Sequence, residues 1–195
     1  MNQTPEEILA TIGYTGFVAS LYNRTGDISK DFAHAVLGVV TEMHELSEAT
    51  DPLNEIEELG DLAFYVEAML IVLNDMAPLS RFLRYSDIEA AQKRLATRDA
   101  MSTATVEWLD LAKRWVGYGK APTMSVYELA IEMVALRETV FMSFVGTHGP
   151  DMYNQAVITN VKKLMKRYNG IKFDAERAVN RDVVAEREVM EKSLN

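Results

Sequence analysis

The sequence predicts an all-α protein in which residues 1–195 form a single helical bundle. Apolar residues recur three and four positions apart along most of the chain, which is the spacing of amphipathic helices. Alternating apolar and polar runs, which are typical of strands, are scarce. Apolar residues make up 48% of the sequence, and this share is sufficient for the packed core of an ordinary globular domain.

Residues that begin or end helices bound each expected element. Thr25-Gly26-Asp27 is a turn that ends in a capping aspartate, and Asp51-Pro52 begins the next helix with a proline in its first turn. Ala77-Pro78 and the segments 117–122 and 147–150, which contain glycine and proline, are breaks. The expected helices are 4–22, 28–49, 53–76, 86–98, 103–116, 125–145, 151–168 and, in the charged tail, 175–190.

Charge and composition exclude several classes of function. The formal net charge of −9 opposes binding to long nucleic acid, and a small phosphate ligand would need a bound cation that reverses the local charge. The chain has no cysteine, which excludes disulfides, thiolate nucleophiles and cysteine-ligated zinc. The longest apolar stretch, 62–73, contains Glu67 and is too short to span a bilayer. We therefore expect a soluble, cytoplasmic protein with no membrane partner.

Two pairs of carboxylates form the candidate metal site. Glu42 and Glu45 lie three residues apart in one expected helix, and this spacing places them on one face. Glu58 and Asp61 have the same spacing in the next helix. A short loop favours antiparallel packing of the two helices, which brings the pairs together, and Gly60 permits a close backbone approach. Facing carboxylates need a counter-charge, and Mg²⁺ prefers oxygen ligands. A single such pair is usually only a solvated helix face, whereas two pairs on adjacent apolar helices favour a site.

Three segments resemble the MazG-like branch of the all-α nucleotide pyrophosphohydrolase superfamily. HAVLGVVTEMHELSEA at 34–49 and NEIEELGDLAFY at 54–65 are similar to the two metal-binding helices of that family. NVKKLMKRYNGIKF at 160–173, followed by AVNRDVVAERE at 178–188, is similar to its C-terminal block. The family motif is E-x-x-E, a spacer and E-x-x-D, and the residues that match it are Glu42, Glu45, Glu58 and Asp61.

The resemblance implies a Mg²⁺-dependent nucleoside triphosphate pyrophosphohydrolase, with Mn²⁺ as a substitute, that cleaves a (d)NTP to a (d)NMP and pyrophosphate. It implies a homodimer or homotetramer in the cytoplasm of a bacterial or phage-infected cell. The four motif carboxylates would be the metal ligands and catalytic residues. The residues implied to contact the nucleotide are Asn160, Lys163, Arg167 and Tyr168.

Other interpretations of the same residues stay open. The enzyme could instead resemble phosphoribosyl-ATP pyrophosphohydrolase. The acidic pairs could also merely solvate a non-enzymatic helical binding protein, and the basic residues of 160–168 could form a solvated helix face. The tail motif Asn180-Arg181-Asp182 could serve only to hold the tail in place. Of the histidines, we expect His34 to be a core residue and His148 to be exposed in its loop.

The region between the second metal-binding segment, which ends at residue 65, and the C-terminal block, which begins at residue 160, suggests a degenerate tandem repeat. VEWLDLAKRWVGYGKAP at 106–122 resembles the stretch that follows the first metal-binding helix in the family. On this hypothesis, 17–76 is the metal-binding repeat, 81–145 is a repeat that has lost two of the four ligands, and 150–195 is the C-terminal helix and tail. The basic loop would contribute Arg114 and Lys120 to substrate binding. The alternative is that these are ordinary amphipathic helices with solvated cations.

Overall fold

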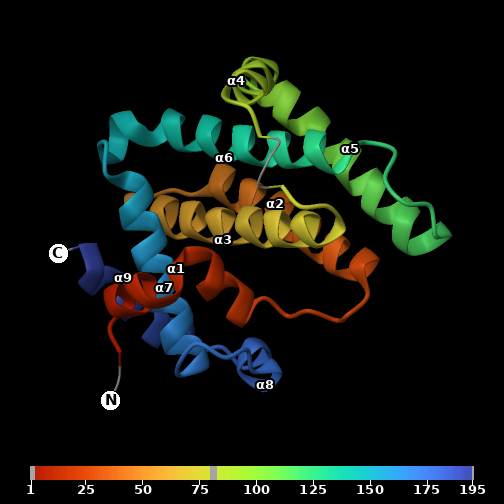
Figure 1. The fold of residues 1–195 in the computed structure, drawn as a ribbon. Helices are drawn as coiled ribbons and strands as arrows, with labels where there is room; N and C mark the ends of the chain where they lie inside the picture. Colours follow the sequence, from red (N-terminus) through yellow and green to blue (C-terminus); the bar gives the residue numbers. More distant parts are fainter. Residues whose placement is uncertain (1–2, 80–82, 195) are drawn as a thin grey trace.

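The computed structural model describes residues 3–79 and 83–194, and these residues form an all-α bundle, as the sequence predicts (Figure 1). The helices within the described ranges are α1 Pro5–Leu21, α2 Ile28–Glu48, α3 Pro52–Met76, α4 Tyr85–Arg94, α5 Arg98–Tyr118, α6 Val126–His148, α7 Met152–Tyr168, α8 Ala175–Val179 and α9 Val183–Leu194.

Side-chain caps fix the starts of the two helices that carry the candidate metal ligands. Asp27 caps α2 by accepting a hydrogen bond from the backbone N–H of Ser29 at 3.0 Å. Asp51 caps α3 by accepting hydrogen bonds from two backbone N–H groups, and Pro52 occupies the first turn. A cap satisfies amide donors that have no partner within the helix, and it therefore favours a helix start at that residue. Both helix starts agree with the sequence prediction to within one residue.

Helix α3 lies at the centre of the molecule (Figure 1). It packs against α2, α6, α7 and α1. Many of its own apolar residues are therefore buried, among them Leu59, Leu62, Val66 and Met69. A helix with partners on most sides is apolar around most of its circumference, which accounts for the apolar stretch at 62–73. That stretch is interrupted by Glu67, which accepts a hydrogen bond from Thr15 of α1. None of the helices described in residues 3–79 and 83–194 is long and apolar enough to cross a membrane.

The structure moves the break between two of the expected helices and divides a third. The expected helix 86–98 ends at Arg94 in α4, and Thr97 then caps α5, which begins five residues before the expected residue 103. The tail forms α8 and α9 instead of one helix over 175–190, because Asp182 accepts a hydrogen bond from the backbone N–H of Ala185 at 3.0 Å. Both corrections have the same cause: a capping side chain starts a new helix within a stretch of helical periodicity.

The second half of the chain covers the first half. Helix α5 packs on α2, α6 packs on α3, and α4 packs on α6. Glu107 and Glu128, the acidic residues that the proposed second repeat retains, are exposed. Buried Glu132 instead accepts hydrogen bonds from Trp108 and Arg94. A tandem repeat stays a prediction about the origin of the chain.

Candidate metal and nucleotide site

A close contact between α3 and α7 lies beneath the site. A Cβ atom at Gly60 would come within 2.7 Å of the backbone oxygen of Ala156 and 2.8 Å of the Cβ of Asn160. Only glycine allows the two helices to approach so closely, because neither neighbouring atom belongs to the far end of a flexible side chain. The sequence predicts a close approach at Gly60 between the two carboxylate helices, whereas the structure places α7, not α2, against Gly60. This approach brings α7 against the candidate metal ligands of α3.

The predicted carboxylates of α2 and α3 converge. Ligand oxygens of Glu42, Glu58 and Asp61 all lie within 4.8 Å of one another, and within the described part of the chain they form a group that could hold a metal ion. Glu45, the fourth predicted ligand, is exposed and lines the same cavity as Glu42 and Asp61. The expected antiparallel pairing of the two helices therefore places three of the four carboxylates together and the fourth at their edge.

The electrostatics of this cluster favour a bound cation. Burial, reinforced by the charge of Asp61, raises the pKa of Glu42 to about 9. Burial and the same neighbouring charge raise the pKa of Glu58 to about 7, and the two glutamates hydrogen-bond to each other. Oε2 of Glu58 is buried and has no hydrogen-bond partner among the described residues. Buried carboxylates that repel one another, with one oxygen unpartnered, are suited to a hard cation with oxygen ligands such as Mg²⁺ or Mn²⁺.

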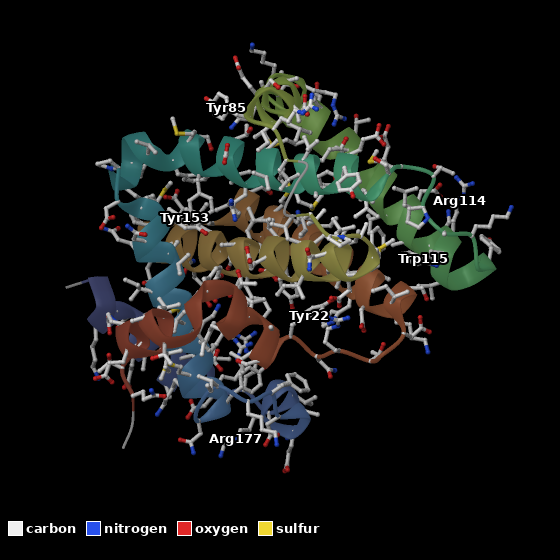
Figure 2. All side chains as sticks on the ribbon, viewed as in Figure 1. Tyr22, Tyr85, Arg114, Trp115, Tyr153 and Arg177 are labelled. Atoms are coloured by element: carbon white, nitrogen blue, oxygen red, sulfur yellow. The ribbon has the colours of Figure 1, made fainter. Side chains whose placement is uncertain are left out.

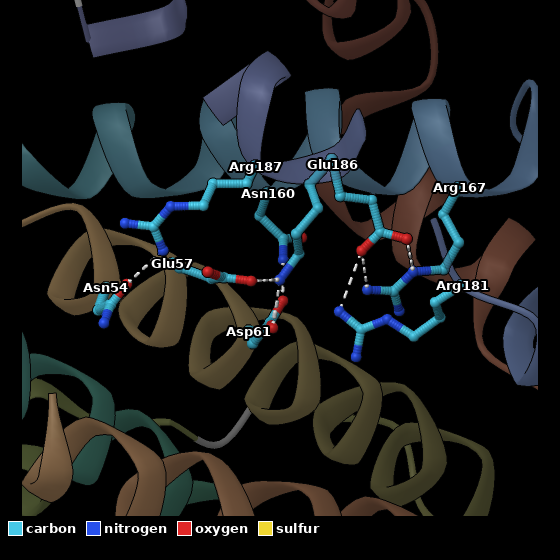
Figure 3. A network of polar contacts seen from close by, with 9 residues as sticks. Asn54, Glu57, Asp61, Asn160, Arg167, Arg181, Glu186 and Arg187 are labelled. Atoms are coloured by element: carbon cyan, nitrogen blue, oxygen red, sulfur yellow. Dashed lines mark hydrogen bonds and ion pairs between the residues drawn. The ribbon is translucent and has the colours of Figure 1, made fainter. Parts of the chain in front are cut away.

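Residues of α7 contact Asp61, one member of the cluster, and Figure 3 shows Asn160 of α7 beside Asp61 of α3. Asn160 donates a hydrogen bond to Asp61, and its own side-chain oxygen is buried without a partner among the described residues. The ammonium group of Lys163 contacts Asp61 and lies 3.2 Å from Glu57. Although burial lowers the pKa of Lys163, these two carboxylates outweigh it and raise that pKa above its ordinary value. Lys163 is therefore charged and offsets part of the negative charge of the site.

Arg167 lies farther along α7 and is held by the C-terminal tail, the segment from Phe173 onward. Its Nε and Nη2 atoms donate to the two oxygens of Glu186 at 3.0 and 2.8 Å. Arg181 donates to the same carboxylate at 3.0 Å (Figure 3). Glu186 is only 2% exposed. Asp182 caps α9 and Arg181 bonds Glu186 within the tail, while Arg167 of α7 is the partner that joins Glu186 to the rest of the protein.

A cavity of about 360 Å³ joins these acidic and basic groups. Aromatic side chains form part of its wall. Tyr22 stacks on His34 with ring centroids 4.8 Å apart, and the ring centroids of Tyr168 and Phe173 lie 5.6 Å apart. Burial lowers the pKa of His34. The residues that line the cavity include Tyr22, His34, Glu42, Glu45, Asp61, Tyr65, Arg167, Tyr168, Phe173 and Arg181.

Several residues of the cavity wall were not predicted as site residues from the sequence, among them Tyr22, His34, Tyr65 and Phe173. His34, Tyr65 and Phe173 lie at the ends of the three segments that resemble the family, and this position is the signal that could have identified them. Tyr22 lies outside those segments. Tyr22 and Phe173 come close through folding, since the backbone N–H of Phe173 donates to the oxygen of Ser20 at 3.4 Å.

Arg114 and Lys120, the predicted substrate contacts of the basic loop, are not among the residues that line this cavity. Trp115 at the end of α5 packs on Phe32, with ring centroids 5.3 Å apart (Figure 2). Phe32 precedes Glu42 by ten residues of α2, or about 15 Å along the helix axis. Lys120 is exposed, and Arg114 lies 3.9 Å from Asp110 of its own helix. A contribution of this loop to the site would therefore have to come from a second copy of the chain.

The expected exposure of His148 is wrong. Its side chain is 7% exposed, and Nε2 lies 2.6 Å from a carboxylate oxygen of Glu55. The reason is that α6 continues three residues beyond the expected residue 145 and carries His148 to the first turn of α3.

Comparison with models of known protein families, with curated proteins and with solved structures finds no match to this chain.

Proposed function

We propose that the protein is a Mg²⁺-dependent nucleoside triphosphate pyrophosphohydrolase that converts a (d)NTP to a (d)NMP and pyrophosphate. One observation carries this proposal: Glu42, Glu58 and Asp61 converge within 4.8 Å in a partly buried site. Two of them, Glu42 and Asp61, line a cavity of about 360 Å³ together with arginines and aromatic rings. This combination provides separate partners for a metal ion, for phosphates and for a base.

The residues that would hold the metal are Glu42, Glu58 and Asp61, with Glu45 at the edge of the group. When bound, Mg²⁺ would polarise phosphate oxygens and activate a water molecule for attack. Asn160 and Lys163 orient Asp61 by donating hydrogen bonds to its two oxygens. Outer residues of this kind fix the direction of a metal ligand and tune its charge.

The rest of the cavity suits the other parts of a nucleotide. Its volume falls within the usual range of roughly 300–1,000 Å³ for small-molecule sites. The guanidinium group of Arg167 can offset charge on a phosphate chain, since planar guanidinium groups match phosphate geometry. The rings of His34, Tyr65 and Tyr168 line the cavity and offer surfaces on which a base could stack.

The alternative of a solvated acidic surface fits the structure less well. Carboxylates on a solvated face are separated by water and keep ordinary titration behaviour. Here Glu42 and Glu58 share a hydrogen bond and have raised pKa values of about 9 and about 7. Holding such a group together costs stability, and a cation that binds the folded cluster recovers it. No feature of the cavity specifically favours phosphoribosyl-ATP over a nucleoside triphosphate.

A panel of ribo- and deoxyribonucleoside triphosphates, incubated with the protein in Mg²⁺ or Mn²⁺, tests the proposal. We expect at least one substrate to yield monophosphate and pyrophosphate, and we expect a chelator to abolish the reaction. Chromatography of the products distinguishes this cleavage from release of inorganic phosphate. Diphosphate as the product, or no turnover of any member of the panel, would contradict the proposal.

A further inference from the structure

The C-terminal tail contributes a wall of the cavity as well as packing against α7. Ala178 and Arg181 line the cavity that also contains the carboxylates, and Phe173 lines it where the tail begins. Helix α9 packs on α7. A residue of the tail is therefore placed to touch any ligand that fills the cavity.

Arg181 has the geometry of a ligand-binding residue. One of its terminal nitrogens, Nη2, donates to Glu186, and its side chain is 41% exposed. A guanidinium group carries five N–H donors, so the contact with Glu186 orients it while leaving other donors available. By contrast, Arg167 uses both Nε and Nη2 on the same carboxylate and is largely buried.

The charge of this group matches an anion. Arg167 and Arg181 carry two positive charges and Glu186 carries one negative charge, which leaves one positive charge on the group (Figure 3). Arg167 follows Asn160 by seven residues, or about 10 Å along α7. The positive group therefore lies beyond the metal-binding carboxylates along the same cavity, where a chain of phosphates would extend.

We propose that Arg181, oriented by Glu186, binds phosphate groups of the ligand in this cavity, and that the C-terminal tail is thus part of the binding site for diphosphate-containing anions. The inference rests on the proposed function for the identity of the natural ligand. Whatever the natural ligand, the inference predicts that the cavity binds pyrophosphate in the presence of Mg²⁺ and that the affinity depends on Arg181. The competing explanation is that Arg181 only holds the tail in place through Glu186.

Calorimetric titration with inorganic pyrophosphate in Mg²⁺ separates the two explanations. Arg181→Ala should weaken pyrophosphate binding at least tenfold. Arg177→Ala is the matched control, because Arg177 lies on the same tail, is 47% exposed and pairs within its own turn with Asp174 at 3.9 Å. It lines a different hollow, which also contains Lys162 and Lys166. Arg177→Ala should change the dissociation constant less than twofold.

Arg181→Lys guards against a purely structural effect. Lysine keeps the positive charge but loses the fork of donors, so its affinity should fall between those of the wild type and Arg181→Ala. Melting temperatures of all variants show whether the tail stays folded. Equal affinity in the wild type and Arg181→Ala would overturn the inference, as would a lysine variant that binds no better than the alanine variant. A loss confined to Arg177→Ala would move the anion site to the other hollow and would also overturn it.

The outcome is distinguishable from failure of the proposed function. Pyrophosphate binding that depends on Arg181, in a protein that hydrolyses no nucleotide, would support the inference and contradict the hydrolase proposal. Hydrolysis with unchanged pyrophosphate affinity and Michaelis constant in Arg181→Ala would retain the hydrolase and overturn the inference. A wild type that binds no pyrophosphate in Mg²⁺ would also overturn it.

Discussion

Lys163 contacts Asp61 directly, and this contact joins α7 to the carboxylate cluster of α2 and α3. The lysine side chain is 1% exposed, and its second partner, Glu57, also belongs to α3. A cation built into the chain thus offsets part of the charge that the metal ligands bring together. The site is consequently coupled to the packing of α7, and stability measurements can detect this coupling without a substrate.

Replacement of Lys163 should destabilise the metal-free protein more than the protein in Mg²⁺. Lys163→Met leaves Asp61 and Glu57 without their cation, and breaking a buried ion pair costs about 3–5 kcal/mol. Both carboxylates are partly exposed, so we expect the lower end of this range. Mg²⁺ supplies a substitute charge and should recover part of the loss. Urea unfolding of the variant with and without Mg²⁺ measures both effects.

Lys162→Met is the control for that experiment. Lys162 precedes Lys163 on α7 but lines a different hollow, and its replacement should change the free energy of unfolding by less than about 1 kcal/mol. Similar losses in the two variants, or no response of Lys163→Met to Mg²⁺, would contradict the coupling.

Gly60→Ala should separate α3 from α7. The new Cβ would lie 2.7 Å from the backbone oxygen of Ala156, so a helix must move. Overpacking of this kind costs about 1–3 kcal/mol, which exceeds the gain of about 1 kcal/mol in helix propensity. The shift should also displace Asn160 from Asp61 and weaken metal binding. Thermal unfolding and Mg²⁺ titration measure the two consequences.

Gly146→Ala provides the opposite expectation. Gly146 lies in α6, is exposed, and has no described atom within 4 Å of the position its Cβ would take. Alanine there should stabilise the protein by about 0.5–1 kcal/mol. If Gly60→Ala also stabilises the protein, the close approach of α3 and α7 is not a constraint on the fold.

The metal cluster could be predicted from the sequence because its determinants are local. Spacing along two helices joined by a short loop places Glu42 opposite Glu58 and Asp61 without knowledge of the rest of the chain. The family resemblance implied that Asn160 and Lys163 contact the nucleotide, whereas in the structure they are buried partners of Asp61 and do not line the cavity. Arg167, Arg181 and Glu186 also lie in the matched segments, but nothing in the sequence pairs them with one another, since a charged tail residue is usually solvated.

Helix boundaries were predictable where a proline or a turn marked them. They were not predictable where a capping side chain, without a proline or a turn beside it, begins the helix. The Asp51-Pro52 start of α3 is explicit in the sequence. Thr97 and Asp182 interrupt stretches with helical periodicity, and whether such a residue caps a new helix or lies inside an old one depends on tertiary packing. In the first of these cases the residue that ends α4, Leu95, is buried.

Glu42→Gln should nearly abolish the proposed hydrolysis while the fold is retained. The amide cannot acquire the negative charge that binds the cation, and near pH 7 it is neutral like the protonated Glu42 that it replaces, so the metal-free variant should be about as stable as the wild type at pH 7 and more stable near pH 9. Asp61→Asn should also abolish activity, but it leaves buried Lys163 with only Glu57 and should lower stability. Turnover and melting temperature, measured together, distinguish these two outcomes.

Glu107→Gln is the control for the loss of activity. Glu107 is the acidic residue that the hypothesis of a tandem repeat matches to Glu45, and it is exposed. Its replacement should leave turnover within twofold of the wild type. Substantial activity in both Glu42→Gln and Asp61→Asn would refute the metal-ligand assignment.

The metal-free protein should lose stability as pH rises from 7 to 9. The pKa of Glu42 is raised to about 9 in the folded state, whereas a glutamate in the unfolded state has a pKa of about 4.3. The folded state therefore holds a proton that the unfolded state has released, and the stabilisation is complete only below the unfolded pKa and is lost as pH rises through 9. At about 1.4 kcal/mol per pKa unit, the expected loss from pH 7 to pH 9 is about 2 kcal/mol. His34, whose pKa is lowered, acts in the opposite sense only below its ordinary value of about 6.5 and does not affect this window.

Urea unfolding in a chelator at pH 7, 8 and 9 measures how the free energy of unfolding depends on pH. This dependence should be much shallower in Glu42→Gln. Because Mg²⁺ binds deprotonated carboxylates, its stabilising effect should grow over the same range. Parallel slopes in the wild type and Glu42→Gln would show that the buried cluster does not govern the pH dependence.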